Sequence, residues 1–178
     1  MVSQKKGGFN DFIYIGVGTN LGDRIENIKR AIEELSLLGI EVIRTASLYE
    51  TPAWGFESED LFLNTVFECV SPIKPIDCLK ATQFVEKKIG RKKTLKEGYE
   101  SRIIDLDILL FKDQQIQSSG LTIPHSYIAE RQFVITPMHE LTGSFFFHSL
   151  GSNFEELKNK FENSDFPFVV YNPPLVNQ

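Results

Sequence analysis

The run 103–111 is the strongest constraint on the fold, because it is apolar except for Asp105 and Asp107. Such a run predicts a β-strand with buried flanks. Side chains alternate between the two faces of a strand, so Asp105 and Asp107 share one face and Leu106 points to the other. Two carboxylates in an apolar run are costly to bury without a compensating cation. Because Mg²⁺ prefers one or two carboxylates together with substrate phosphates, the pair indicates a metal–phosphate site; a solvent-facing edge strand is the alternative.

A cationic segment leads directly into this strand. Residues 87–102 contain seven Lys or Arg side chains against two Glu, within a chain whose net charge is −5. Cations neutralise the charge on phosphate oxygens, so this segment beside the aspartate pair suits a phosphate-bearing substrate. An ordinary solvated loop is the alternative interpretation of the same composition.

Strand-like and helix-like segments alternate along the rest of the chain. The pattern predicts strands at 12–17, 40–49, 61–70, 121–123 and 166–171. It predicts helices that end before Gly39, span 75–89, follow Pro124, and span 153–161. This order is α+β, and two strand–helix–strand halves can form an antiparallel sheet with helices on one face, as in ferredoxin-like folds.

Length and composition favour one folded domain with a hydrophobic core, since the chain has 178 residues and 42% hydrophobic content. We expect this domain at 12–161, with a polar segment at 1–11 and a partly β tail at 162–178. The net negative charge argues against a nucleic-acid binder. Cys69, Cys78 and three scattered His do not form a zinc ligand set and favour reduced thiols. With no secretory signal and no apolar run of roughly 18 residues, a cytoplasmic protein without a membrane span is expected.

A glycine-rich turn follows the first strand, with Gly16, Gly18 and Gly22 before a helix. A dinucleotide fingerprint would need its third glycine at position 21, which is Leu21. The chain also lacks the P-loop pattern. The spacing therefore favours a structural turn, although a helix N-terminus there would suit an anion.

Several weaker signals add binding groups. Thr51, Pro52 and Trp54 form a stiff turn with an aromatic surface, and Asn64 offers both a donor and an acceptor to a flat heterocycle. His125 can donate to a phosphate or titrate near neutral pH. Each of these residues alone is more often structural than functional.

Together, the motifs resemble those of the 6-hydroxymethyl-7,8-dihydropterin pyrophosphokinase family. The resemblance runs from about residue 12 to 141 and rests on the order of its motifs: Gly18-Thr19-Asn20-Leu21-Gly22, Tyr49-Glu50-Thr51-Pro52, Phe62-Leu63-Asn64, Arg102-Ile103-Ile104-Asp105-Leu106-Asp107-Ile108, Ile123-Pro124-His125 and Arg131-Gln132-Phe133. It implies a monomeric ferredoxin-like α/β sandwich, an antiparallel sheet with flanking helices. It also implies transfer of pyrophosphate from ATP to the pterin hydroxymethyl group with release of AMP, a step of folate biosynthesis with small-molecule partners only.

The resemblance also implies roles for individual residues. The ligands of two Mg²⁺ ions would be Asp105 and Asp107. The catalytic set would be Arg91, Arg102, Asp105 and Asp107. The pterin pocket would comprise Thr51, Pro52, Trp54, Phe62, Asn64 and Phe133. The ATP contacts would be Glu86, Arg91, Lys93, Arg102, Ile108, His125 and Arg131.

The sequence departs from the family pattern just before the aspartate strand. Tyr99 stands where the family usually has Trp, and Ser101 stands where it usually has Pro. We expect Tyr99 to act as a lid over the site and Ser101 to leave the segment before Arg102 freer. Two rival functions remain open at this point: another metal-dependent phosphoryl or nucleotidyl transferase, and a non-catalytic ligand-sensing module on the same scaffold.

Overall fold

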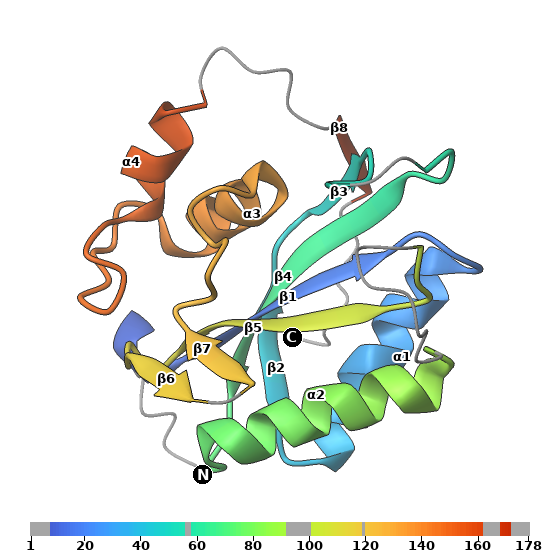
Figure 1. The fold of residues 1–178 in the computed structure, drawn as a ribbon, viewed down its shortest axis with the longest axis horizontal. Helices are drawn as coiled ribbons and strands as arrows, with labels where there is room; N and C mark the ends of the chain where they lie inside the picture. Colours follow the sequence, from blue (N-terminus) through green and yellow to red (C-terminus); the bar gives the residue numbers. More distant parts are fainter. Residues whose placement is uncertain (1–7, 56–57, 92–100, 119, 162–167, 172–178) are drawn as a thin grey trace, which may run out of the picture.

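An antiparallel sheet forms the centre of the protein (Figure 1). The structure is a computed structural model, and it describes residues 8–55, 58–91, 101–118, 120–161 and 168–171. The strand order is β5-β1-β4-β3-β8, and β2 also pairs with β4. The strands are β1 (Ile13–Thr19), β2 (Glu41–Thr45), β3 (Leu48–Thr51), β4 (Phe62–Val70), β5 (Asp105–Phe111) and β8 (Phe168–Tyr171).

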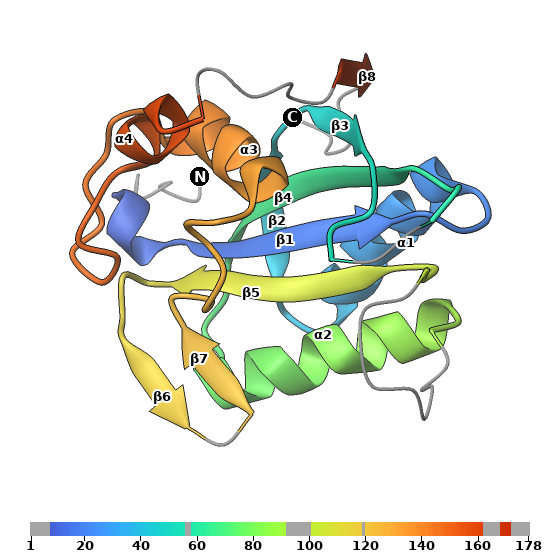
Figure 2. The same cartoon turned by 45° about the horizontal axis from the view of Figure 1, so that its top comes forward.

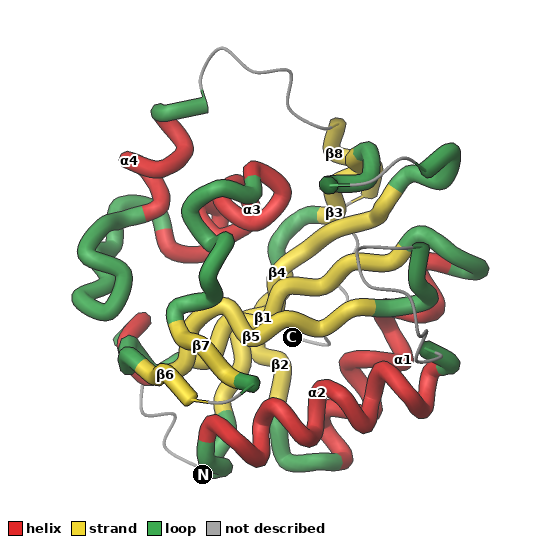
Figure 3. Tube along the Cα trace, viewed as in Figure 1, coloured by secondary structure: helices red, strands yellow, loops and turns green. Residues whose placement is uncertain are grey.

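Helices cover both faces of the sheet (Figure 2). On one face lie α1 (Arg24–Leu37) and α2 (Pro75–Ile89), and on the other lie α3 (Gln132–Thr142) and α4 (Phe154–Asn159). A small hairpin of β6 (Ile116–Ser118) and β7 (Leu121–Ile123) follows β5, and a short 3₁₀ helix (Phe9–Asp11) precedes β1 (Figure 3). The predicted antiparallel sheet with flanking helices is confirmed. The strand–helix order alone predicted helices on one face of the sheet, whereas α3 and α4 cover the second face as well.

The core has two parts because side chains alternate across the strands. Ile13, Ile15 and Val17 of β1 face α1 and α2, whereas Tyr14 faces the layer of α3 and α4. Both Cys69 and Cys78 are buried free thiols on the α1–α2 side, and burial raises the pKa of Cys78 to about 12. The two thiols are therefore protonated core groups.

Local sequence signals explain where the first helix begins and ends. The carboxylate of Asp23 accepts from the main-chain N–H of Glu26 at 3.0 Å, which satisfies an otherwise unpaired donor at the start of α1. Gly39 follows the helix with a φ of 78°, a conformation that favours glycine. The predicted stop at Gly39 is confirmed.

Some predicted boundaries were wrong. Strand β1 continues to Thr19, so Gly16 and Gly18 lie within the strand and only Gly22 lies in the turn. Strand β5 begins at Asp105 rather than at 103, and the helix expected after Pro124 begins only at Gln132. Among the described helices, none is long and apolar enough to span a membrane.

An ion pair between the exposed Arg44 and the buried Glu68 ties the sheet to α3. Glu68 is 1% exposed, and Arg44 binds its carboxylate with two hydrogen bonds of 2.8 and 2.6 Å. Tyr14 donates to the same carboxylate at 3.0 Å, and Arg44 donates to the carbonyl of Leu141 in α3 at 2.9 Å. Because Arg44 and Tyr14 donate hydrogen bonds to its carboxylate, the negative charge of the buried Glu68 is compensated.

Candidate active site

Strand β5 presents two carboxylates on the side of the sheet that faces α3. Asp105 and Asp107 lie on this face, and Leu106 between them is buried against α1 and α2. The predicted alternation is therefore confirmed. Both carboxylates line one pocket and remain partly accessible, with side-chain exposures of 24% and 36%.

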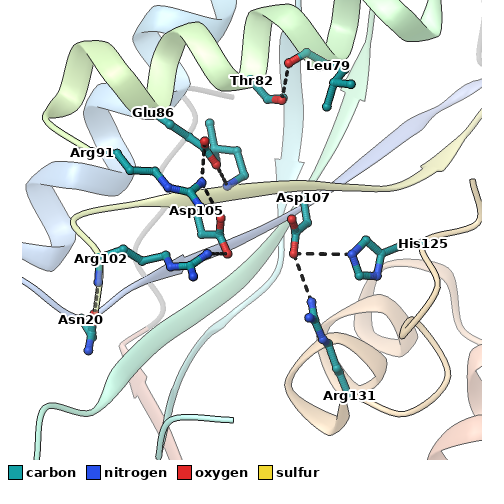
Figure 4. Close-up of polar contacts among 11 residues, drawn as sticks. Asn20, Leu79, Thr82, Glu86, Arg91, Arg102, Asp105, Asp107, His125 and Arg131 are labelled. Carbon is teal, nitrogen blue, oxygen red and sulfur yellow. Dashed lines mark hydrogen bonds and ion pairs between the residues drawn. The ribbon is translucent and has the colours of Figure 1, made fainter. Parts of the chain in front are cut away.

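Two arginines hold Asp105 (Figure 4). Arg91 Nη1 lies 2.8 Å from one carboxylate oxygen, and Arg102 Nη1 lies 2.7 Å from the other. Arg91 follows the end of α2 and Arg102 precedes β5, so the two ends of the cationic segment meet at the first aspartate. This leaves positive groups beside the carboxylate where a phosphate oxygen can reach them.

Glu86 of α2 supports this arrangement from the edge of the strand. One carboxylate oxygen accepts from the main-chain N–H of Leu106 at 2.8 Å, and the other lies 2.5 Å from Arg91 Nη1. Burial, followed by the negative charge of Asp105, raises the pKa of Glu86 to about 7, against the opposing effects of the Leu106 N–H and Arg91. Glu86 thus connects α2, β5 and Arg91, and it is not among the residues that line the pocket.

The second aspartate faces Arg131 and His125. Arg131 Nη1 donates to Asp107 at 3.1 Å, and His125 Nε2 lies 3.8 Å from the same oxygen (Figure 4). Burial and the charge of Asp105 raise the pKa of Asp107, against His125 and Arg131, and burial lowers the pKa of His125. The negative charge of Asp107 is therefore incompletely compensated by the described residues.

A bulge in β5 places His125. The pairing of β1 with β5 shifts register between Tyr14 and Ile15, so Leu109 is the extra residue on β5. The carbonyl of Leu109 accepts from the main-chain N–H of His125 at 2.9 Å. The extra residue leaves the β5 ladder locally interrupted, and this main-chain bond brings the segment after β7 to the aspartates.

The pocket continues from the aspartates into an aromatic and amide-lined end. All six residues expected to bind a pterin line it, namely Thr51, Pro52, Trp54, Phe62, Asn64 and Phe133. Asn64 is 5% exposed, and its side-chain amide donates to Thr51 Oγ1 at 2.8 Å. The amide is thereby oriented with its carbonyl oxygen free to serve as an acceptor.

Two glycines of β1 form part of the pocket wall. A Cβ atom on Gly18 would lie 3.1 Å from Asn64 Oδ1, and one on Gly16 would lie 3.3 Å from Leu109. A side chain at either position would crowd these groups and narrow the pocket. The predicted turn is therefore wrong for Gly16 and Gly18, which lie in β1 and line the pocket, where a missing side chain leaves space.

Arg131 lies among aromatic rings. Its guanidinium carbon is 4.8 Å from the ring centre of Trp54, 5.4 Å from that of Tyr127 and 5.8 Å from that of Phe133. Arg131 is 6% exposed, so these cation–π contacts are shielded from water. The rings hold the guanidinium in place beside Asp107.

Not every expected ATP contact lies at the pocket. The side chain of Ile108 is buried in the α1–α2 part of the core, which leaves only its main chain for a nucleotide. Lys93 and the expected lid residue Tyr99 lie outside the described residues. The freedom expected at Ser101 is not what the structure shows, because its hydroxyl lies 2.9 Å from the amide nitrogen of Asn20 and 3.3 Å from Ser58 Oγ.

Sequence reasoning did not single out Tyr127 or the role of Asn20. Tyr127 contacts Trp54 and Arg131, and its main-chain N–H donates to His125 Nδ1 at 3.2 Å. Asn20 Oδ1 accepts from the main-chain N–H of Arg102 at 2.7 Å. Tyr127 carried no signal beyond its aromatic ring between His125 and Arg131, whereas Asn20 belongs to the motif Gly18-Thr19-Asn20-Leu21-Gly22.

The aspartate pair fits a magnesium site. Among the described residues no group of three or more His, Cys, Asp or Glu side chains is placed to hold a metal ion. Mg²⁺, however, commonly takes one or two carboxylates and completes its shell with water and substrate phosphates. The raised pKa of Asp107 beside Asp105 also indicates a place where an added cation is favourable.

Comparison with known proteins agrees with this geometry. A family model described as 7,8-dihydro-6-hydroxymethylpterin-pyrophosphokinase matches residues 14–143. The chain belongs to this pyrophosphokinase family. A 2-amino-4-hydroxy-6-hydroxymethyldihydropteridine pyrophosphokinase of Aquifex aeolicus is 40% identical over 129 residues, covering 72% of this chain and 79% of that protein. The enzyme of the same name from Bacillus subtilis is 35% identical over 133 residues, covering 74% and 78%.

Larger relatives also carry this pyrophosphokinase region. The folic acid synthesis protein fol1 of Pneumocystis carinii is 35% identical over 170 residues, which cover 93% of this chain but 23% of that protein. A solved structure of Plasmodium falciparum HPPK-DHPS with pteroate superposes with a TM-score of 0.69 at 14% identity. The match covers 84% of this chain and 44% of that one, and at this identity it shows the fold alone.

Proposed function

We propose that this pyrophosphokinase transfers the pyrophosphoryl group of ATP to 6-hydroxymethyl-7,8-dihydropterin, a step of folate biosynthesis. The observation that carries the proposal is a single pocket with two chemically distinct ends. One end has the amide of Asn64 and the rings of Phe62 and Phe133, and the other has Asp105 and Asp107. Family membership supplies the identity of the pterin and of the products, the pterin diphosphate and AMP.

The pterin end suits a flat heterocycle. Phe62 and Phe133 offer aromatic faces, and the Asn64 amide, buried and oriented by Thr51, offers hydrogen bonds to a ring edge. Such a pocket binds by stacking and by a few fixed polar groups. It directs the hydroxymethyl group toward the aspartate end.

The aspartate end suits the triphosphate. When bound, two Mg²⁺ ions held by Asp105 and Asp107 would neutralise charge on the phosphate oxygens. Arg102 and Arg131 line the same pocket and Arg91 reaches Asp105, so their guanidinium groups can hold the phosphates. The pterin hydroxyl oxygen then forms a bond to the β-phosphorus and its proton is released to water, the bond from that phosphorus to the oxygen of the α-phosphate breaks, and AMP leaves with that oxygen.

The test is a product assay on the purified chain with ATP, magnesium and the reduced pterin. We expect AMP to appear only when both substrates are present, with no ADP. Release of ADP, or turnover with an unrelated acceptor in place of the pterin, would favour another phosphoryl transferase. Pterin binding without AMP release under any condition would favour a ligand-sensing module.

Three further expectations belong to the same proposal. We propose that residues 12–161 form the catalytic unit, that the chain acts as a monomer, and that it is cytoplasmic. The sheet also includes β8, which follows residue 161 in the sequence and pairs with β3 at the edge of the sheet. Sedimentation analysis of the purified chain tests the monomer.

A further inference from the structure

The hydroxyl of Ser101 lies between two loops that border the pocket. Asn20, immediately after β1, places its side-chain nitrogen 2.9 Å from Ser101 Oγ. Ser58, in the connection from β3 to β4, places its hydroxyl 3.3 Å from the same oxygen. Ser101 itself stands directly before Arg102 at the entry to β5. One hydroxyl therefore contacts the segments that carry the phosphate end and the pterin end.

The direction of the hydrogen bond between Asn20 and Ser101 follows from the groups involved. An amide nitrogen can only donate, so Ser101 accepts from Asn20. Ser58 Oγ accepts from the main-chain N–H of Asp60 at 3.1 Å and donates to the carbonyl of Asp60 at 3.2 Å. Either hydroxyl can be the donor in the contact between Ser58 and Ser101. The Ser101 hydroxyl is therefore bonded both to Asn20 and to Ser58.

Asn20 transmits this contact to Arg102. Its side chain is buried, with 5% exposure, so the orientation of the amide is fixed by its partners. With its nitrogen donating to Ser101, its oxygen accepts from the main-chain N–H of Arg102 at 2.7 Å. The main-chain N–H of Asn20 also donates to the carbonyl of Arg102 at 3.2 Å. Arg102 is held on both sides of its main chain, and its side chain reaches Asp105.

We propose that Ser101 is a positioning residue that fixes Arg102 through Asn20 and links this alignment to the β3–β4 connection through Ser58. The expected effect on turnover rests on the proposed pyrophosphokinase reaction. The link between the two loops through Ser101 and Ser58 does not, because it is tested in the ligand-free protein. It assigns to the Ser101 hydroxyl a role that a residue without a hydroxyl could not perform at this position.

The first measurement is steady-state turnover of four serine variants. Ser101→Ala should lower kcat/KM for ATP about three- to tenfold, the loss expected for one hydrogen-bonding group, while Ser101→Thr retains the hydroxyl and the activity. Ser58→Ala leaves the Asn20 contact in place and should lower kcat/KM by less than about twofold. Ser118→Ala, in the hairpin of β6 and β7, is the matched control and should behave as wild type. Equal turnover in Ser101→Ala and wild type, or equal losses in Ser101→Ala and Ser58→Ala, would overturn the positioning of Arg102.

The second measurement needs no substrate. Trp54 is the sole tryptophan of the chain and stands in the same β3–β4 connection as Ser58. In the ligand-free protein, both Ser101→Ala and Ser58→Ala should increase the quenching of its fluorescence by acrylamide, whereas Ser101→Thr and Ser118→Ala should not. Unchanged quenching in the two first variants would overturn the link between the loops.

The two measurements separate this proposal from the reaction on which it rests. If the wild-type protein releases no AMP, the proposed reaction fails, and with it the effect of Ser101 on turnover. The quenching results then still decide whether Ser101 links the two loops. If AMP is released and both predictions for Ser101→Ala fail, only the role of Ser101 is overturned.

Discussion

At the scale of single residues, Asp107 allows function to be separated from stability. Its raised pKa means that the folded state disfavours its charge, so stability is gained on protonation and lost as pH rises through the folded pKa. Asp107→Asn removes the charge and keeps an oxygen that can accept from Arg131. We therefore expect kcat to fall about a hundredfold or more. The free energy of unfolding of the metal-free protein should stay unchanged or rise slightly, as measured by urea denaturation at pH 7. A less stable variant with normal turnover would contradict this interpretation.

Asn64 should affect one substrate only. Asn64→Ala removes the oriented amide from the pterin end and leaves both aspartates in place. We expect pterin affinity to weaken by roughly 1–3 kcal/mol, because a buried hydrogen-bonding site is left unsatisfied. Affinity for a non-hydrolysable ATP analogue without pterin should remain within about twofold. Isothermal calorimetry with each ligand separately tests this, and equal losses for both ligands would argue against the assignment.

Tyr127 should act through Arg131. Its ring contacts the guanidinium and Trp54, and it is 42% exposed, so its removal leaves the hydrophobic core intact. Tyr127→Ala should reduce kcat/KM for ATP about two- to fivefold, the equivalent of about 0.5–1 kcal/mol for one cation–π contact. Tyr127→Phe retains the ring and should retain the activity. If Tyr127→Phe is as impaired as Tyr127→Ala, the phenolic hydroxyl rather than the ring is responsible.

At the scale of the elements, Asp113 connects the turn after β5 to the loop between α3 and α4. Its carboxylate accepts from the main-chain N–H groups of His148 and Ser149, at 3.1 and 2.8 Å, and from the Ser149 hydroxyl. These bonds outweigh burial and lower the pKa of Asp113. Its contribution to stability is therefore present above the unfolded pKa near 3.9 and is lost as pH falls through the lower folded pKa.

The matching substitution tests this connection. Asp113→Asn should lower the free energy of unfolding at pH 7 by about 1–2 kcal/mol, because at least one accepted hydrogen bond is lost. The difference from wild type should shrink in acid. Turnover should be unchanged. Asp113→Asn should thus lower stability and keep activity, the reverse of what we expect for Asp107→Asn. Urea denaturation at pH 7 and pH 3 provides the measurement, and a difference that grows in acid would contradict a lowered pKa of Asp113 in the folded state.

The elements also show what sequence patterns can and cannot predict. The alternation of Asp105, Leu106 and Asp107 follows from strand geometry alone, and it was predicted correctly. The bulge at Leu109 was not predicted, because neither glycine nor proline marks it and it depends on pairing with β1. The start of α3 at Gln132 was missed for a similar reason, since the main-chain N–H of His125 bonds to the distant Leu109 carbonyl and the bonds within 125–130 close local turns.

At the scale of the whole molecule, the pocket residues were grouped by family resemblance rather than by local pattern. Thr51 and Phe133 stand far apart in the sequence, and the sheet and α3 bring them to one pocket. Propensity indicates neither the strand order nor the layer of α3 and α4. Glu86 is bonded to Arg91 and Leu106, a relation that depends on how α2 lies along β5, and its contact with ATP stays a prediction.

The glycines of β1 have a consequence for the whole protein. Where most strands place side chains, Gly16 and Gly18 leave room for the pocket, whose lining includes Leu109 and Val134 of the hydrophobic core under α3. We therefore expect a heterocycle bound in the pocket to cover these core side chains, as an interior side chain would. The pterin should stabilise the folded state, adding about 2.7 kcal/mol to the free energy of unfolding at a hundred times its Kd. A thermal melt with increasing pterin should show a rising Tm in wild type, and Gly18→Ala should have lost that rise.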